Sequence, residues 1–279
     1  MIVIADSGST KTQWVLLDKA EVIADITTKG FNPYYYEARE LEDDLFNELQ
    51  GKIDSTLVDK VFFYGSGCST ESNCLLVKNS LQLFFKDADI RTDHDLTGTA
   101  TALFQNEKGI ACILGTGSNS CLWDGHHVVE NVPSLGWLLA DDGSGTHIGK
   151  LFLTTILYGD ASDALTEKFY KTYGLDFEST LHKLYSESNP NKFFASLSKF
   201  VGENINHPEC KKAVEDSFAA FVEHQLSKYT GYQKLTVSFV GSVAYVYRDI
   251  LKGVLDTHQI NTGIILQKPM EGLIRYHAG

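Results

Sequence analysis

The feature that most constrains the fold is a unit that occurs twice, about a hundred residues apart. In each copy an apolar strand, a loop of glycine and hydroxyl residues, a second strand, a turn and a third strand follow one another, over residues 2–25 and 110–131. The loops are Asp6-Ser-Gly-Ser-Thr-Lys-Thr12 and Gly115-Thr-Gly-Ser118. A repeated supersecondary unit predicts a duplicated domain in place of one Rossmann-like sheet.

Neither loop is followed by the helix that familiar phosphate-binding loops open. Residues 119–123 read as a strand, closed by the turn Asp124-Gly125. In Rossmann and P-loop proteins the glycines begin a helix whose N–H groups hold the anion. A tight turn can also bind phosphate through converging backbone N–H groups, where glycines allow a close approach and hydroxyls add donors. The residues expected to serve this way are Gly8, Ser9, Thr10, Gly115, Thr116, Gly117 and Ser118. The alternative is that each loop is only a tight hairpin.

Composition narrows the class of protein. The chain has 279 residues, 43% of them hydrophobic, and a formal net charge of −12 without a basic stripe. These values favour a globular protein of one or two domains and argue against a nucleic-acid partner. No apolar run is long enough to span a bilayer, and the N-terminal residues lack the features of a signal peptide. Five cysteines without a C-x-x-C pair indicate reduced thiols, so we expect a cytoplasmic protein without membrane contact.

The rest of the chain alternates predicted helices and strands. Further strands are expected at 58–64, 89–93 and 235–240. Helices are expected at 37–52, 75–85, 96–104, 146–158, 161–173, 176–186, 191–206, 210–229, 243–251 and 270–277.

The two loops resemble the phosphate-1 and phosphate-2 loops of the sugar kinase/Hsp70/actin superfamily. Within it the chain is most similar to the BadF/BadG/BcrA/BcrD ATPase family, and there to the N-acetylglucosamine kinases. The resemblance covers nearly the whole chain and implies an α/β fold of two actin-like (ribonuclease H-like) domains with a central cleft between them. We expect an N-terminal domain over 1–106, a C-terminal domain over 107–268, and a helix within 269–279 that returns to the first domain. A homodimer is compatible with the resemblance, but the sequence does not show one.

The resemblance implies ATP and Mg²⁺ as cofactors. Asp6 ends the first strand and suits Mg²⁺ bound through water, because that ion keeps much of its hydration. Lys11 would add positive charge near the transferred phosphate. Val237-Ser-Phe-Val-Gly-Ser-Val243 resembles the superfamily's adenosine loop, with Gly241-Ser242 where two glycines are usual.

Three stretches are candidates for the sugar side of the site. Leu135-Gly-Trp-Leu-Leu-Ala-Asp-Asp-Gly-Ser-Gly145 resembles the Gly-Trp…Asp-Glu-Gly-Ser segment of N-acetylglucosamine kinases, with a spacing one residue shorter and Asp142 in place of Glu. An aromatic platform beside carboxylates suits a sugar's C–H faces and hydroxyls. The alternative is that Trp137 is a core residue and that Asp141 and Asp142 cap the next helix. The residues expected to touch the sugar are Asn32, Asn119, Gly136, Trp137 and Asp141. Asn32 precedes a proline, so it is equally an ordinary turn residue.

One carboxylate must take the proton from the attacking hydroxyl. In the related kinases this base precedes a helix of small residues, about twenty positions before the second phosphate loop. Asp95, followed by Leu96-Thr-Gly-Thr-Ala-Thr-Ala102, fits this description, and Asp93 is the reserve choice. Alternation along an extended segment predicts that His94 points elsewhere. The alternative role for Asp95 is to cap its helix.

The sequence therefore predicts an ATP-dependent amino-sugar kinase that acts on the 6-hydroxyl of N-acetylglucosamine. N-Acetylmuramic acid and glucosamine are alternative acceptors. A different class within the same family is an ATP-driven activator of a radical dehydratase, which bridges an iron–sulfur cluster with two cysteines per subunit. No exposed cysteine pair is expected in this chain.

Overall fold

The structure, a computed structural model, describes residues 1–8, 10–186 and 190–279. The chain forms two compact units. The first comprises residues 1–107, 125–128 and 269–279, and the second comprises residues 108–124 and 129–268. Ser9, one of the predicted phosphate-loop residues, lies outside the described residues. No helix in the described part of the chain is long and apolar enough to cross a bilayer.

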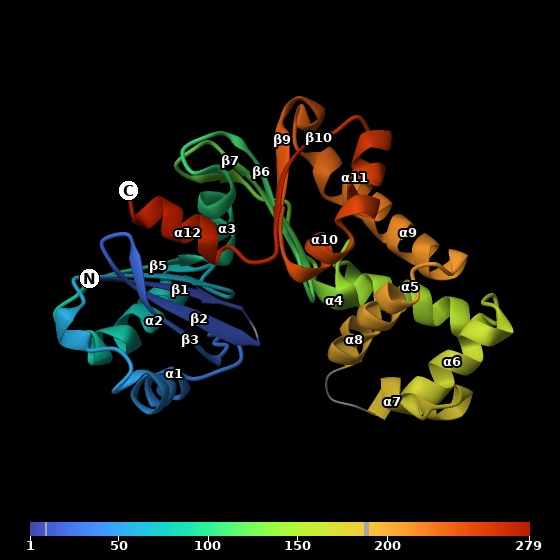
Figure 1. Cartoon of the computed structure of the whole chain (residues 1–279), viewed down its shortest axis with the longest axis horizontal. Coiled ribbons are helices and arrows are strands. Elements are labelled where there is room, and N and C mark those ends of the chain that lie inside the picture. Colours follow the sequence, from blue (N-terminus) through green and yellow to red (C-terminus); the bar gives the residue numbers. More distant parts are fainter. Residues whose placement is uncertain (9, 187–189) are drawn as a thin grey trace. The chain divides into compact units, whose positions relative to one another are not determined.

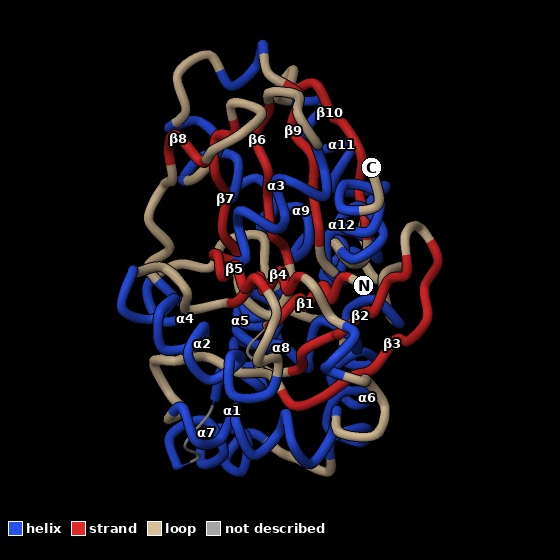
Figure 2. The backbone as a smooth tube through the Cα atoms, turned by 90° about the vertical axis from the view of Figure 1, so that its left-hand side faces the viewer, coloured by secondary structure: helices blue, strands red, loops and turns tan. Residues whose placement is uncertain are grey.

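The first unit contains a mixed five-stranded sheet with the order β3-β2-β1-β4-β5 (Figure 1). Its strands are β1 (Ile2–Ser7), β2 (Lys11–Asp18), β3 (Glu21–Lys29), β4 (Lys60–Gly65) and β5 (Asp89–His94). β2 runs antiparallel to β1 and β3, because short turns join the three, whereas β4 runs parallel to β1 and β5. Figure 2 shows this β1–β2–β3 meander in red, with β3 at the edge of the sheet.

Helices cover both faces of this sheet. They are α1 (Ala38–Asp44), the π-helical turn η1 (Leu45–Leu49), the 3₁₀ turn η2 (Ser55–Leu57), α2 (Glu71–Phe84), α3 (Asp95–Phe104) and α12 (Met270–His277). Side chains alternate along β1, so Val3 and Ala5 share a core with α1, η1 and α2, while Ile4 packs with α3 and α12. The C-terminal helix α12 contacts α3, as Figure 1 shows in red and green. Helices α3 and α12 therefore pack against each other on the same face of the sheet.

The second unit repeats the same sheet. Its strands are β6 (Gly109–Leu114), β7 (Ser118–Trp123), β8 (Val128–Glu130), β9 (Thr236–Val240) and β10 (Asn261–Leu266), in the order β10-β9-β6-β7-β8. In both sheets the first strand in the chain lies at the centre, its meander partners lie on one side, and the two later strands lie on the other. β6 pairs antiparallel with β7 and parallel with β9, as β1 does with β2 and β4. The predicted duplication of an α/β unit is confirmed.

The helices of the second unit surround a large aromatic core. They are α4 (Gly136–Leu139), α5 (Gly145–Tyr158), α6 (Asp163–Tyr173), α7 (Phe177–Ser186), α8 (Pro190–Glu203), α9 (Pro208–His224), η3 (Leu226–Lys228), η4 (Tyr232–Lys234), α10 (Ser242–Val246) and α11 (Arg248–Thr257). Phe152, Phe169, Phe200 and Phe218 are buried in this core, and the Phe152 ring lies 5.8 Å from Phe169 and 5.5 Å from Phe200. The predicted helix over 243–251 is two helices that meet at Tyr247.

Candidate active site

The first cluster of predicted site residues lies at the carboxyl edge of the first sheet. Ser7 pairs with Gly65, and Gly65 pairs with His94, so the ends of β1, β4 and β5 lie side by side. The loop after β1, the turn after β4 and Asp95 therefore leave the sheet at one edge. Ligands of open α/β sheets bind outside the carboxyl ends of parallel strands.

The first hairpin loop joins Ser7 to Lys11, and the buried hydroxyls of Ser7 and Thr12 hold its two ends together. Gly8 N–H donates to Lys11 O at 3.0 Å, and the Ser7 and Thr12 hydroxyls lie 2.7 Å apart. A Cβ on Gly30 would lie 2.2 Å from Gly8 O and 2.6 Å from Lys11 N. The loop therefore rests directly on the backbone of Gly30, where only glycine fits.

The polar side chains of this loop face outward to different degrees. Thr10 and Lys11 are exposed, and Asp6 is half-buried on β1 opposite Gln13 and Tyr64. An exposed ammonium and hydroxyl beside backbone N–H groups can hold phosphate, and a single carboxylate is enough for Mg²⁺ when phosphate and water supply its other ligands. The described residues contain no group of three or more His, Cys, Asp or Glu side chains that could hold a metal by themselves.

Asn32 is a buried turn residue at this edge. Its Oδ1 accepts a hydrogen bond from Tyr34 N–H at 2.9 Å, and a Cβ on Gly67 would lie 2.4 Å from the same oxygen. The turn role considered for this asparagine is therefore observed. Among the described residues none accepts a hydrogen bond from its Nδ2, so the amide group retains two donors.

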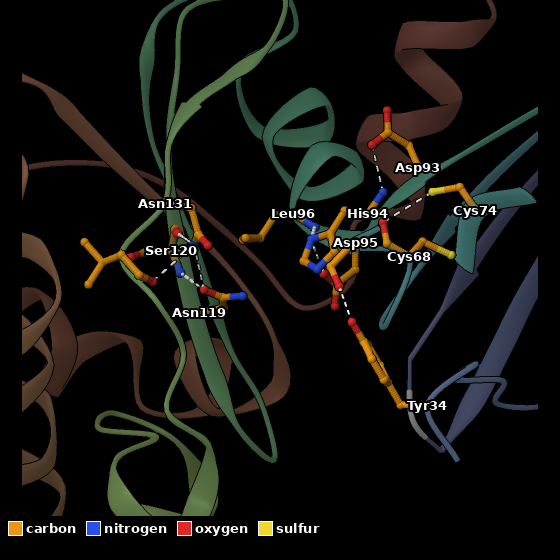
Figure 3. Close-up of polar contacts among 12 residues, drawn as sticks. Tyr34, Cys68, Cys74, Asp93, His94, Asp95, Leu96, Asn119, Ser120 and Asn131 are labelled. Carbon is orange, nitrogen blue, oxygen red and sulfur yellow. Dashed lines mark hydrogen bonds and ion pairs between the residues drawn. The ribbon is translucent and has the colours of Figure 1, made fainter. Parts of the chain in front are cut away.

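Asp95 is the first residue of α3, and His94 is the N-cap. His94 Nδ1 lies 2.9 Å from Asp95 Oδ1 and accepts from Leu96 N–H at 3.1 Å (Figure 3). The expectation that His94 points elsewhere is wrong, because an N-cap side chain folds back over the first turn of its helix. Asp93 is exposed and its Oδ1 accepts from the His94 N–H at 2.8 Å. The helix cap is thus His94, while Asp95 lies at the sheet edge.

The second hairpin loop, in the second unit, is held by the N-terminus of α5. Gly145 N–H donates to Gly115 O at 2.8 Å, and Thr146 donates to Thr116 O through both its N–H (3.2 Å) and its hydroxyl (2.7 Å). Gly115 N–H donates across the loop to Gly117 O at 3.0 Å. Within the described residues, the N–H groups of Thr116 and Gly117 make no hydrogen bond. The carbonyls are therefore occupied, while two N–H groups remain for an anion.

Asp141 lies against this loop. Ser118 N–H donates to its Oδ1 over a long 3.4 Å, and a Cβ on Gly117 would lie 2.9 Å from its Oδ2. Asp141 has a left-handed backbone with φ of 60°, and burial raises the pKa of its carboxyl. It does not cap α5, whose N-cap is Ser144. The capping alternative for Asp141 is thus not observed.

The neighbouring Asp142 is a buried carboxylate in a hydrogen-bonded network that sequence reasoning missed. Its carboxylate lies 2.9 Å from His224 Nδ1 and 3.4 Å from His147 Nε2. His147 Nδ1 in turn lies 2.9 Å from the Ser217 hydroxyl, which accepts from Gly143 N–H at 3.1 Å. Burial lowers the pKa of His147, so its neutral form is favoured despite the nearby carboxylate. This network ties residues 142–143 to α5 and α9.

The segment that carries Gly136 and Trp137 is the short helix α4. Lys150 of α5 donates to Trp137 O at 2.7 Å and to Ala140 O at 3.3 Å, which fixes the segment. Trp137 is half-buried, with its ring 6.3 Å from Phe194, so it is not a core residue. Gly136 has φ of 73°, which favours glycine. The half-exposed indole of Trp137, four residues before Asp141, offers an apolar surface on which the C–H face of a sugar could stack.

Asn119 and Gly241-Ser242 are the remaining predicted site residues of the second unit. Asn119 Oδ1 accepts from Ser120 N–H at 2.9 Å and from Asn131 Nδ2 at 3.1 Å (Figure 3). Gly241 has φ of 131°, and a Cβ there would lie 2.1 Å from Leu114 O. The strand, glycine and helix expected of an adenosine loop are thus packed directly beside the start of the second hairpin loop, with Ser242 exposed.

The cysteines offer no exposed pair. Cys68, Cys112, Cys121 and Cys210 are buried and Cys74 is half-buried. Burial raises the pKa of the Cys74 thiol, and it raises that of Cys210 to about 12. No two of these thiols are exposed together, which is what a surface iron–sulfur cluster would require.

Comparison with solved structures finds the same architecture in sugar kinases. A structure from Porphyromonas gingivalis, named a putative N-acetylglucosamine kinase, superposes with a TM-score of 0.95 and 36% identity over 100% of this chain and 99% of its own. A protein of the same name from Chromobacterium violaceum gives 0.71 and 16% identity over 99% and 98%. A ROK family glucokinase from Streptomyces griseus, solved with glucose and AMPPNP, gives 0.60 and 12% identity over 98% and 97%. No family model and no curated protein matches the chain.

Proposed function

The chain belongs to the family of sugar kinases that includes the putative N-acetylglucosamine kinase of Porphyromonas gingivalis, and we propose that it transfers the γ-phosphate of ATP to the 6-hydroxyl of N-acetylglucosamine. The fold is the actin-like α/β fold of these kinases. The narrower resemblance to the BadF/BadG/BcrA/BcrD family stays a prediction.

The observation that carries the proposal is the position of Asp95. This carboxylate leaves the sheet at the same edge as the first hairpin loop, two strands away, at the end of β5. Phosphoryl transfer needs a carboxylate oriented on the attacking hydroxyl and donors that neutralise the phosphate charge. In the proposed reaction Asp95 accepts the hydroxyl proton while the hydroxyl oxygen bonds to phosphorus and ADP leaves.

The phosphate chain is assigned to the two hairpin loops. Thr116 and Gly117 N–H groups, with the Thr10 and Ser118 hydroxyls and the Lys11 ammonium, supply the donors that phosphate oxygens require. Gly241-Ser242 is assigned to the adenosine, and a glucokinase of the same fold holds the ATP analogue AMPPNP. Asp6 would hold Mg²⁺ through water, and the ion would neutralise charge on the phosphates.

The sugar is assigned to the indole of Trp137 and to the polar side chains of Asp141, Asn32 and Asn119. Trp137 offers an apolar face, Asp141 accepts from hydroxyls, and Asn32 retains two donors for a hydroxyl or the acetamido oxygen. The Asn119 carbonyl oxygen already accepts two hydrogen bonds, so its Nδ2 is the group left for the sugar.

A screen of acceptors tests the proposal. Purified protein is incubated with Mg-ATP and N-acetylglucosamine, N-acetylmuramic acid, glucosamine or glucose, and ADP release is coupled to a spectroscopic readout. We expect the highest kcat/KM with N-acetylglucosamine and a 6-phosphate product by NMR. A preference for N-acetylmuramic acid or glucosamine would replace the proposed acceptor, and no activity on any of these sugars would contradict the kinase assignment.

A further inference from the structure

The backbone around Asp141 adopts conformations that most residues avoid. Asp141 has φ of 60° and Gly143 has φ of 79°, both in the left-handed region. A residue other than glycine in this region costs free energy, and it persists only where its surroundings fix it. The conformation of Asp141 places its carboxylate against the second hairpin loop, where Ser118 N–H donates to Oδ1. The groups that hold this conformation are found on the next two residues.

Asp142 anchors the segment through its side chain. Its carboxylate lies between two imidazoles, with Oδ2 2.9 Å from His224 Nδ1 and Oδ1 3.4 Å from His147 Nε2. His147 belongs to α5 and His224 to α9. The Asp142 side chain is 11% exposed, and a carboxylate so shielded from water is stable only where donors meet its charge. Asp142 is thereby fixed to two helices.

Ser217 of α9 anchors the next peptide group. This buried hydroxyl accepts from Gly143 N–H at 3.1 Å, and His147 Nδ1 lies 2.9 Å from the same oxygen. Because the oxygen accepts from Gly143, its own proton is the one that bonds to His147 Nδ1. The neutral imidazole then carries its proton on Nε2, which faces Asp142. The anchors of residues 142 and 143 are therefore one connected network.

The hairpin loop is held by other groups. The N-terminus of α5 donates to Gly115 O at 2.8 Å and to Thr116 O at 2.7 Å, and neither bond involves Asp142. What the network fixes is the peptide that follows Asp141. Its loss should therefore release Asp141 and leave the loop in place.

We propose that Asp142 is a positioning residue that holds Asp141 in its left-handed conformation and so presents the Asp141 carboxylate to a sugar hydroxyl. This role rests on the proposed function, in which Asp141 accepts a hydrogen bond from the sugar. The carboxylate has capacity left for that bond, because Ser118 N–H and the Ser134 hydroxyl use only two of its about four acceptor sites. Asp142 acts on sugar binding, whereas proton transfer is assigned to Asp95.

Asp142→Ala removes the anchor and leaves Asp141 unchanged. We expect the KM for N-acetylglucosamine to rise at least about tenfold, with kcat and the KM for Mg-ATP within about threefold of the wild type. Val214→Ala is the matched control, because it removes buried methyl groups from the core face of the same helix α9 and leaves the network intact. The control should keep the wild-type KM for the sugar. A folded Asp142→Ala protein with the wild-type KM would overturn the proposal.

His224→Ala is the variant that decides if Asp142→Ala does not fold. The His224 side chain is 56% exposed, so its removal leaves the core intact and deletes one of the two imidazoles on the carboxylate. We expect a rise of about threefold in the KM for the sugar. The wild-type KM in this variant would also count against the positioning role.

A double-mutant cycle separates positioning from a general structural role. If Asp142 acts through Asp141, then Asp142→Ala should raise the KM for the sugar in the wild-type background and add nothing in the Asp141→Ala background. The same factor in both backgrounds would show that Asp142 acts independently of Asp141, and the proposal would fall.

The amide signal of Ser118 in NMR spectra reports on Asp141 without turnover. Asp141→Ala removes the acceptor of this N–H and should shift the signal, and Asp142→Ala should shift it in the same direction. A Ser118 signal that Asp142→Ala leaves unchanged would refute the positioning role even if the enzyme is a kinase. Inactivity of the wild type on every amino sugar, with the Ser118 signal shifted as expected, would instead refute the proposed function alone.

Discussion

At the scale of single residues, Gly30 is the position where adding one methyl group should weaken nucleotide binding. A Cβ there would lie 2.2 Å from the backbone oxygen of Gly8, so Gly30→Ala must displace the first hairpin loop. We expect weaker binding of Mg-ATP, by about tenfold, and a loss of about 1–3 kcal/mol in the free energy of unfolding. Gly253→Ala is the control, because that exposed glycine of α11 has open space at its Cβ. It should be neutral or gain up to about 1 kcal/mol. Equal ATP affinity in both variants would count against the loop's role.

His277 should make stability depend on pH. Burial lowers its pKa from 6.5 to about 4, its ring stacks on Phe62, and its Nε2 lies 2.9 Å from the Tyr64 hydroxyl. Below pH 6.5 the unfolded chain binds a proton that the folded chain rejects, so stability is full above that pH and falls as pH drops toward 4. This group should remove about 2 kcal/mol between pH 7.5 and pH 5. Urea unfolding at both values should show a smaller loss for His277→Gln, and identical losses would disprove the assignment.

Residues were predictable where chemistry is local and unpredictable where it depends on packing. The carboxylate before a helix of small residues and the glycines of the hairpins are visible in the sequence. The contact of His94 with Asp95 is not visible in the sequence. It follows from the N-cap conformation of His94, in which side chains no longer alternate as they do along an extended segment. The network of Asp142 and His224 joins residues 82 positions apart, so no sequence pattern predicts this contact.

At the scale of elements, the C-terminal helix supports the helix that presents Asp95. A Cβ on Gly272 of α12 would lie 2.3 Å from Ala102 O of α3, a backbone atom that cannot move alone. Gly272→Ala should therefore lower the free energy of unfolding by about 1–3 kcal/mol, measured in urea. It should also lower kcat. Glu271→Ala, on the exposed side of the same helix, should change neither by a measurable amount, and a Gly272→Ala protein with wild-type stability would contradict the close packing.

Two elements escaped prediction for physical reasons. The edge strand β10 (Asn261–Leu266) contains Gly263 and only half-buried or exposed residues, so it lacks the apolar run that revealed β9. Helix α4 (Gly136–Leu139) has four residues, too few for a helical period, and is held by Lys150 from another helix. Most other elements were predicted because each buries an apolar face in one of the cores.

At the scale of the whole molecule, the repeat predicted two sheets of one topology, and each unit has its own apolar core. Nucleotide binding is assigned to loops of both units, so it should stabilise the folded chain. Mg-AMPPNP at 100 times its Kd should add about 2.7 kcal/mol to the free energy of unfolding, visible as a higher Tm in calorimetry. Removing Mg²⁺ with EDTA should abolish most of this gain. A Tm that AMPPNP leaves unchanged in the presence of Mg²⁺ would contradict nucleotide binding.

The central claim is that Asp95 takes the proton of a sugar hydroxyl. Asp95→Asn keeps the size of the side chain and removes its basicity, so nucleotide binding should be retained while transfer is lost. Single-turnover transfer from labelled Mg-ATP to N-acetylglucosamine measures that step directly. We predict a rate at least about 100-fold below that of the wild type, with AMPPNP affinity unchanged. A rate close to that of the wild type would contradict the account.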